Sequence, residues 1–246
     1  MSTLQMSRRA LDKLYSRLAF QHSASLTWEQ TMESTDQSKQ REITLESLAI
    51  VRAKWPEFQV FNELLILYPY HEANLKRPAR VCPDNMVIVH HKPIKAKGSF
   101  NVPLQPALPT LILEYVSTEN DRKDYVDNRR RYASDLQVPF YLLFEPEAQK
   151  LTVFRLSGKK YVAVKPNAAG RLEIPPLKLE VAILDGWVRF WFEGELLPLP
   201  DELVRILDAA TVRAEAATVR AETAEAENER LKKEIAKLKA ARNGTH

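Results

Sequence analysis

The stretch Leu-Ile-Leu-Glu-Tyr-Val, residues 111–116, is apolar on both faces of an extended chain except at Glu114. Successive side chains of a strand point to opposite faces of a sheet, so this run predicts a central strand covered on both sides. Val-Pro-Phe-Tyr-Leu-Leu-Phe, residues 138–144, has the same character. Together the two runs predict the middle of a β-sheet with one buried glutamate inside it.

Other short runs of β-branched and aromatic residues surround this pair, and turn residues separate them. They span residues 59–69, 81–89, 151–156, 160–164, 172–174 and 187–192. One helix is expected between the central strands, from Thr118 to about Leu136, with Thr118 or Asn120 as its cap. This order of elements predicts a mixed β-sheet core flanked by helices, in the α/β (α+β) class.

The prolines divide the chain, because all fifteen lie between Pro56 and Pro200 and leave both ends able to form helices. Helices are predicted over residues 8–20 and 44–54, with a polar, flexible connection at residues 30–40. We therefore expect an N-terminal helical segment packing on the core, a globular domain and a helical tail, over residues 1–55, 56–200 and 201–246.

The tail repeats apolar residues at alternating spacings of three and four. With Asn228 and Ile235 at position a of a heptad, Leu231 and Leu238 fall at position d. Ile at a, Leu at d and a single Asn at a favour a parallel two-stranded coiled coil. Three g-to-e′ pairs have opposite charges: Arg220 with Glu225, Glu227 with Lys232, and Glu234 with Lys239. The pattern predicts a homodimer; the alternative is a solitary, solvated, Ala-rich helix.

Composition excludes several classes of protein. With 45% hydrophobic residues, 28% charged residues and one cysteine, the chain fits a core-forming cytoplasmic protein and not a disulfide-stapled one. We expect no secretory signal and no membrane partner, because no apolar run is long enough to span a bilayer. The six glycines form no phosphate loop, so no nucleotide cofactor is predicted.

The formal net charge of +4 comes from residues 1–200, since acidic and basic residues balance in the tail. The basic residues gather in three clusters: Lys76, Arg77 and Arg80; Lys92, Lys95 and Lys97; and Arg122, Lys123, Arg129, Arg130 and Arg131. Three clusters flanking one candidate site favour a phosphate-binding rim for nucleic acid, with ordinary solvated faces as the alternative. The residues predicted to bind nucleic acid are Lys92, Lys95, Lys97, Arg122, Arg129 and Arg130.

Two carboxylates require an explanation. Glu114 lies in a strand apolar on both faces, and Asp84 stands after Pro83 and before the apolar run 86–89. Buried carboxylates brought together repel and raise each other's pKa unless a positive group lies between them. A hard cation such as Mg²⁺, which prefers oxygen ligands, is one solution. The alternatives are that each acid pairs with an arginine, or that Asp84 caps a turn.

Glu63 is a possible third acid, because it is embedded in the otherwise apolar run Phe61-Asn62-Glu63-Leu64. The alternative is that it faces solvent on an edge strand.

Several features resemble, in their order and spacing, the family of putative restriction endonucleases, a branch of the PD-(D/E)XK nuclease superfamily. They are Pro83-Asp84, residues 113–117, Asp124, Tyr132-Ala133 and residues 138–141. The resemblance covers about residues 55–240, because some members also end in a coiled coil. It implies a restriction-endonuclease-like fold in which Asp84, Glu114 and the main-chain carbonyl of Tyr115 hold Mg²⁺ or Mn²⁺. The metal would activate water to hydrolyse phosphodiester bonds of DNA.

The chain departs from the family pattern at its lysine. The usual lysine two residues after the second acid is Val116 here, and Asn128 occupies the position on the following helix that often supplies it instead. Lys123 lies five residues before Asn128, about 140° away around an α-helix, and would substitute only if the helix started late. The candidate catalytic residues are thus Asp84, Glu114, Lys123 and Asn128.

We accordingly predict a Mg²⁺-dependent DNA endonuclease that forms a dimer through its tail. A catalytically degenerate nucleic-acid-binding or interaction module is the alternative, favoured by the neutral Asn128. A structural adaptor that works through the coiled coil is the third possibility.

Overall fold

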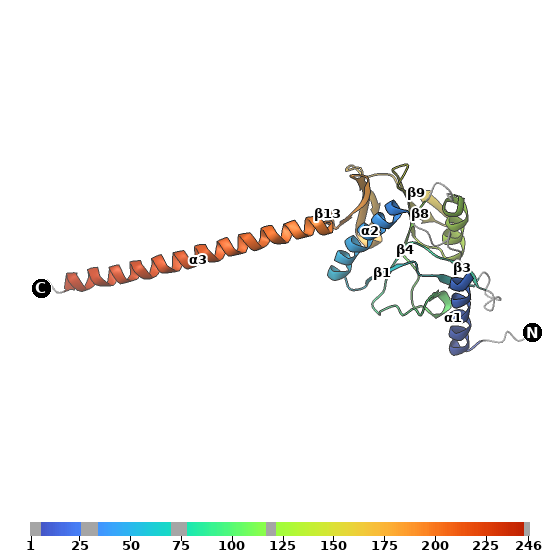
Figure 1. Ribbon diagram of the computed structural model, residues 1–246, viewed down its shortest axis with the longest axis horizontal. Helices are drawn as coiled ribbons and strands as arrows, with labels where there is room; N and C mark the ends of the chain where they lie inside the picture. The colour runs from blue at the N-terminus through green and yellow to red at the C-terminus, as the bar shows by residue number, and fades with distance from the viewer. Residues whose placement is uncertain (1–5, 26–33, 70–77, 117–121, 244–246) are drawn as a thin grey trace, which may run out of the picture. The chain divides into compact units, whose positions relative to one another are not determined.

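The chain is described by a computed structural model that covers residues 6–25, 34–69, 78–116 and 122–243 (Figure 1). It divides into two units, Met1–Leu197 and Pro198–His246. The predicted caps Thr118 and Asn120 and the basic residues Lys76 and Arg77 lie outside the described residues.

The first unit is built on a six-stranded sheet with the strand order β1-β4-β6-β7-β8-β9. The two predicted central strands, β6 and β7, lie side by side in its middle and are parallel, whereas the other neighbouring strands are antiparallel. The mixed sheet of an α/β (α+β) protein is therefore confirmed. The strands are β1 (Phe58–Asn62), β4 (Asn85–Val89), β6 (Leu111–Tyr115), β7 (Phe140–Glu145), β8 (Lys150–Ser157) and β9 (Lys160–Ala163).

Each face of this sheet is covered by its own apolar core, as the composition of β6 requires. Leu111 and Leu113 join a core formed with α2 and the four-stranded sheet. Ile112 and Val116 join a second core on the opposite face, with side chains from the three-stranded sheet and the helical segment after β6. Glu114 alternates with Leu113, so its carboxylate belongs to the second face.

Two smaller sheets complete the unit, with orders β10-β11-β12-β13 and β3-β2-β5. The predicted strand at 59–69 is wrong as a single element, because the chain turns at Glu63, whose φ is 47°, and continues in another sheet. The elements are β2 (Ile66–Tyr68), β3 (Ala79–Val81), β5 (Phe100–Asn101), η3 (Val102–Leu104), β10 (Leu172–Ile174), η6 (Pro175–Leu177), β11 (Leu179–Leu184), β12 (Trp187–Phe192) and β13 (Glu195–Leu196).

The two N-terminal helices are longer than predicted. They are α1 (Arg8–Ser25) and α2 (Thr35–Lys54). The predicted flexible connection at 30–40 is wrong for residues 35–40, which are helical. Ser34 and Gln37 form a capping box, in which each side chain accepts from the backbone amide of the other residue, and this starts α2 early.

Helix α2 packs against β1 and against β12 of the four-stranded sheet (Figure 1). Gln40 explains how the polar N-terminal half of α2 is buried. Its amide oxygen accepts from the Val188 amide at 2.8 Å, and its amide nitrogen donates to the Val188 carbonyl at 3.1 Å. The Gln40 side chain thus pairs both polar backbone groups of Val188, a buried strand residue. This pairing allows a polar segment of α2 to be buried against the sheet.

The helix between β6 and β7 is described from Arg122 onward and is not a regular α-helix. Two of its segments, η4 (Lys123–Asn128) and η5 (Arg131–Asp135), have π-helical turns. In a π turn, residue i+5 bonds back to residue i, so side chains five positions apart come closer to one face than in an α-helix.

The second unit contains α3 (Pro200–Asn243), a single helix of 44 residues, as the tail pattern predicts. Every described side chain from Leu203 to Lys239 is exposed on this helix. Within the described residues, no helix is both long enough and apolar enough to cross a membrane.

Replacing Gln40 by Met should destabilise the first unit by about 2–4 kcal/mol, because both backbone groups of Val188 would stay buried without a partner. Urea unfolding measures the difference. Gln21→Met on the exposed side of α1 is the matched control and should change stability by less than about 0.5 kcal/mol. A Gln40→Met protein as stable as the control would show that these bonds do not hold α2 in place.

Candidate functional site

Asp84 and Glu114 meet where β4 begins and β6 ends. The two strands are antiparallel, with Asn85 opposite Leu113, so the next residues along each strand, Asp84 and Glu114, face each other. The Asp84 amide donates to Glu114 Oε2 at 3.1 Å, and the Tyr115 amide donates to Asp84 Oδ2 at 2.6 Å. Each carboxylate is thus fixed by a backbone amide of the opposite strand.

Glu114 is the more deeply buried of the pair. It is 1% exposed, whereas the side chain of Asp84 is 27% exposed. Burial raises the pKa of Glu114 well above its usual value, and the charges of Asp84 and Asp124 raise it further. Burial also raises the pKa of Asp84, although the bond from the Tyr115 amide opposes that rise. The fold therefore makes it costly for both carboxylates to be ionised at once.

Two side chains from the helical segment bond to the other oxygen of Glu114, and a third side chain from that segment extends the cluster. Glu114 Oε1 accepts from the Tyr132 hydroxyl at 2.6 Å and from Asn128 Nδ2 at 3.2 Å. Asn128 also donates to Asp124 Oδ1 at 2.9 Å. Burial raises the pKa of Asp124 to about 6, with Lys123 opposing the rise and Asp84 adding to it.

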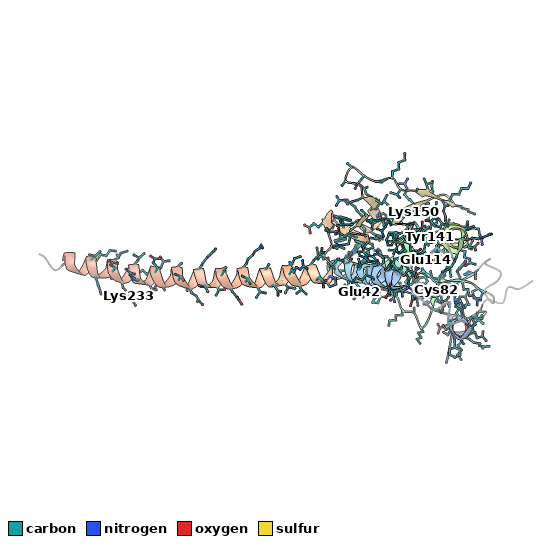
Figure 2. All side chains as sticks on the ribbon, turned by 45° about the horizontal axis from the view of Figure 1, so that its top comes forward. Glu42, Cys82, Glu114, Tyr141, Lys150 and Lys233 are labelled. Carbon is teal, nitrogen blue, oxygen red and sulfur yellow. The ribbon has the colours of Figure 1, made fainter. Side chains whose placement is uncertain are left out.

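The influence of this charge extends to neighbours of Glu114 on both sides. Figure 2 labels Glu114 between Tyr141 and Cys82. Burial raises the pKa of Tyr141, and Glu114 is the largest electrostatic contribution to that rise. The Cys82 thiol is exposed, but partial desolvation by its surroundings raises its pKa to about 11, and Glu114 is again the largest charge that adds to the rise. Such a thiol stays protonated at neutral pH and is a poor nucleophile.

Lys123 lies within electrostatic reach of the three acids. Its Nζ is 4.0 Å from Asp124 Oδ1. Burial opposes its charge, but Glu114, Asp124 and Asp84 outweigh burial and raise its pKa. The expected 140° separation from Asn128 does not apply, because residues 123–128 form a π turn.

Arg41 of α2 is a member of the site that the sequence analysis did not identify. Its Nη1 lies 2.8 Å from Glu63 Oε1, and its Nη2 lies 3.7 Å from Asp84 Oδ1. The side chain of Glu63 is 58% exposed, and its backbone amide donates to the carbonyl of Asp84. Glu63 therefore lies beside the acid pair, held by an arginine at the surface.

The main-chain carbonyl of Tyr115 is also part of this region. It accepts from Gln37 Nε2 at 3.2 Å, near the start of α2. The Tyr115 hydroxyl donates to Asn85 Oδ1 at 2.6 Å and lies 2.9 Å from Thr44 Oγ1. Helix α2 thus anchors the end of β6 from both the backbone and the side chain.

The predicted basic residues occupy different surroundings. Lys92, Lys95 and Lys97 are exposed on the loop after β4, and Arg122 and Arg130 are exposed on the helical segment. Arg129 is engaged within the fold, because its guanidinium donates to the Tyr161 carbonyl and lies 4.4 Å from the centre of the Phe154 ring. Arg129 therefore has a packing role in addition to the one predicted for it.

The available oxygen ligands suit a hard divalent cation. Within the described residues, no three His, Cys, Asp or Glu side chains are grouped to hold a metal. The potential set consists of Asp84, Glu114 and the Tyr115 carbonyl, all of them oxygen ligands of the kind that hard divalent cations prefer. Strong mutual repulsion in the pair is a condition that a cation would relieve.

A separate hollow of about 570 Å³ contains none of these acids. It lies over β8, β9 and η6 and is lined by Phe140, Arg155, Val162, Ala163, Val164, Lys165, Glu173, Pro175 and Pro176. The acid pair and this hollow therefore lie in different parts of the first unit.

Comparisons with known proteins agree with a restriction-endonuclease-like class. The model of the Uma2 family, described as putative restriction endonuclease, matches residues 31–185. Because this match spans more than half of the chain, the protein belongs to that family, which confirms the resemblance. No curated protein matches the chain.

Solved structures also match. One is the crystal structure of a putative nuclease belonging to DUF820 from Anabaena variabilis ATCC 29413. It shares 15% sequence identity with a TM-score of 0.41, over 59% of this chain and 75% of that chain.

Asp124→Asn should stabilise the metal-free protein in a pH-dependent way. The folded chain binds the Asp124 proton more tightly than the unfolded chain, since its pKa rises from 3.8 to about 6. Wild-type stability should therefore fall relative to the variant as pH rises from about 4 to 7, by up to about 3 kcal/mol.

Urea unfolding in chelator at both ends of this range measures the effect. Asp127→Asn, exposed on the same helical segment, is the control and should show no such trend. An advantage of Asp124→Asn that shrinks as pH rises would contradict the assignment.

Proposed function

We propose that the chain is a Mg²⁺- or Mn²⁺-dependent DNA endonuclease that hydrolyses phosphodiester bonds. The observation that carries this proposal is the reciprocal bonding of Asp84 and Glu114, which holds two carboxylates together beside the Tyr115 carbonyl. Membership of a nuclease family supports the reaction class, and the oxygen ligands support the choice of metal.

In this proposal Asp84, Glu114 and the Tyr115 carbonyl hold the metal. A bound Mg²⁺ would lower the pKa of its water and neutralise charge on the phosphate. Tyr132 and Asn128 orient Glu114 through its Oε1, which leaves Oε2 facing Asp84. Because the ligands are held by β4, β6 and the helical segment, their geometry is set before substrate arrives.

Lys123 acts as a cation and not as a base in this scheme. The surrounding acids raise its pKa, so its ammonium group keeps its proton at neutral pH. In the proposed mechanism, this ammonium group would balance charge that develops on the phosphate in the transition state. Asn128, at the position where the family often has lysine, contributes two N–H donors and no charge.

The nucleic-acid-binding residues proposed for the rim are Lys92, Lys95, Lys97, Arg122, Arg129 and Arg130. All six are positively charged. The three lysines lie on the loop after β4 and the three arginines on the helical segment after β6. This positive charge favours a polyanionic substrate over a neutral one.

The tail is proposed to form a parallel homodimer. Leu231, Ile235 and Leu238 are 47%, 51% and 67% exposed on α3, so the heptad seam is available to a second copy. Asn228 at position a and the three opposite-charge pairs favour a parallel, in-register pairing. Two nuclease units in one dimer would act on the two strands of a duplex.

A second candidate function is a catalytically degenerate nucleic-acid-binding module. Two observations favour it: Asn128 is neutral, and the Arg41 guanidinium lies 3.7 Å from Asp84 Oδ1, where it competes with a metal. In this case the fold would bind nucleic acid without cleaving it.

Calorimetry and plasmid nicking should separate the two functions. Asp84→Asn and Glu114→Gln should lose Mn²⁺ binding. Each should also reduce the nicking rate by more than roughly 10–100-fold, which is the usual loss when a residue that only hydrogen-bonds to a metal ligand is replaced. Lys123→Gln should keep metal binding but nick more slowly. Glu46→Gln, exposed on α2, is the matched control and should behave as wild type.

Two results would decide between the endonuclease and the degenerate binding module. Wild-type protein that binds metal but nicks no faster than the double variant of Asp84 and Glu114 supports the degenerate module. Wild-type protein that binds no metal rejects the proposed catalytic chemistry.

Substitution of the seam should dissociate the dimer. The double change Leu231→Lys and Ile235→Lys puts charge at positions d and a and should give a monomer in sedimentation equilibrium. Asn228→Leu should instead alter the oligomer order or register. Val219→Lys, at the outer position f, is the control and should leave the dimer intact. A wild-type chain that sediments as a monomer would refute the dimer.

A further inference from the structure

A second hollow, of about 310 Å³, lies on the same side of the fold as the helical segment that follows β6. We call it the arginine hollow. Its walls come from β2, from β3 with the preceding Pro78, and from η5 with the preceding Arg130. It is lined by Tyr68, Pro78, Ala79, Arg80, Arg130, Arg131 and Asp135. Residues far apart in sequence thus bring three guanidinium groups to one place.

The hollow carries an excess of positive charge. Of the described residues, Asp135 is the one carboxylate that lines it, and Asp135 Oδ2 accepts from the Tyr68 hydroxyl at 3.3 Å. Among the residues that the structure describes, no carboxylate lies within 4.0 Å of Arg80, Arg130 or Arg131 to form an ion pair. Three arginines that face one hollow without such partners are typical of a site for an anion.

Arg131 connects the hollow to the acid pair. Its Nη1 donates to Asn128 Oδ1 at 3.4 Å, and Asn128 in turn donates to Glu114 Oε1. The accepted bond from Arg131 fixes which way the Asn128 amide points, so its nitrogen is directed at Glu114 and Asp124. An anion bound by Arg131 in the hollow would therefore be linked to the proposed catalytic carboxylate of Glu114 through two side chains, Arg131 and Asn128.

We propose that the arginine hollow binds a phosphate group of the nucleic-acid substrate, next to the phosphate that is cleaved. Guanidinium groups suit this ligand because each presents parallel N–H donors that match two phosphate oxygens. The inference rests on the proposed nuclease function, and it adds Arg80 and Arg131 to the substrate-contacting residues.

The size and the walls of the hollow suit a single phosphate group. The hollow is at the small end of ligand-binding cavities, which suits a phosphate with part of its sugar and not a whole nucleotide base pair. Arg80 is exposed on β3 and Arg130 is exposed on the helical segment, so the ligand is gripped from two sides. The Tyr68 hydroxyl donates its single proton to Asp135 and so orients that carboxylate at the wall of the hollow, which leaves the arginines as the donors for the ligand.

The test measures binding of a short DNA duplex to the full chain in chelator, so that cleavage plays no part. Arg80→Gln combined with Arg130→Gln should weaken binding about tenfold or more and reduce the slope of log K against log salt by about 1. Arg52→Gln, exposed in the last turn of α2, is the matched control and should change neither quantity.

The two sources of phosphate are separated by the ends of the duplex. An equal loss with 5′-phosphorylated and 5′-hydroxyl duplexes supports an internal phosphodiester, and a loss confined to the 5′-phosphorylated duplex supports a terminal phosphate. Wild-type chain that binds DNA while the double variant binds equally well, with the same salt slope, overturns the hollow alone. Wild-type chain that binds no DNA overturns the nuclease proposal and the hollow together.

Discussion

The arrangement of the site depends on one interaction, the reciprocal bonding between the ends of β4 and β6. Each strand gives a backbone amide to the carboxylate of the other, at Asp84 and Glu114. The ladder between the strands fixes this pairing, because a register shift by one residue would turn Glu114 to the opposite face. Burying two carboxylates together is unfavourable, and the hydrogen bonds from Asn128 and Tyr132 and the nearby charge of Arg41 reduce this free-energy cost.

Helix α2 shows why part of this support was invisible in the sequence. Gln37, Gln40, Arg41 and Thr44 follow the i, i+3, i+4, i+7 spacing of a helix face, but they are polar. Because residues 30–40 lack apolar periodicity, they were predicted to be a flexible connection, and the helix was predicted to begin only at Thr44. In the structure these polar side chains bond to Tyr115, Val188 and Asp84. Their partners are distant along the chain, so only the folded structure shows what they do.

The central part of the fold was predictable because its residues have few alternatives. Runs apolar on both faces must be covered on both sides, and this located β6 and β7, while a carboxylate inside such a run singled out Glu114. The position of Lys123 was not predictable, since the spacing argument assumed 3.6 residues per turn and the chain adopts π turns. Backbone irregularity of this kind depends on tertiary packing and has no simple sequence signal.

The irregular helix also bears on the neutral Asn128. Three acids, Asp84, Glu114 and Asp124, share this part of the fold with the cations Arg41 and Lys123. A lysine in place of Asn128 would add a third cation and remove the uncompensated negative charge that a divalent metal requires. With Lys123 already brought to the cluster by the π turn, a neutral donor at position 128 keeps Glu114 oriented and leaves that charge in place. The absence of lysine at 128 is thus compatible with metal-dependent chemistry at this pair.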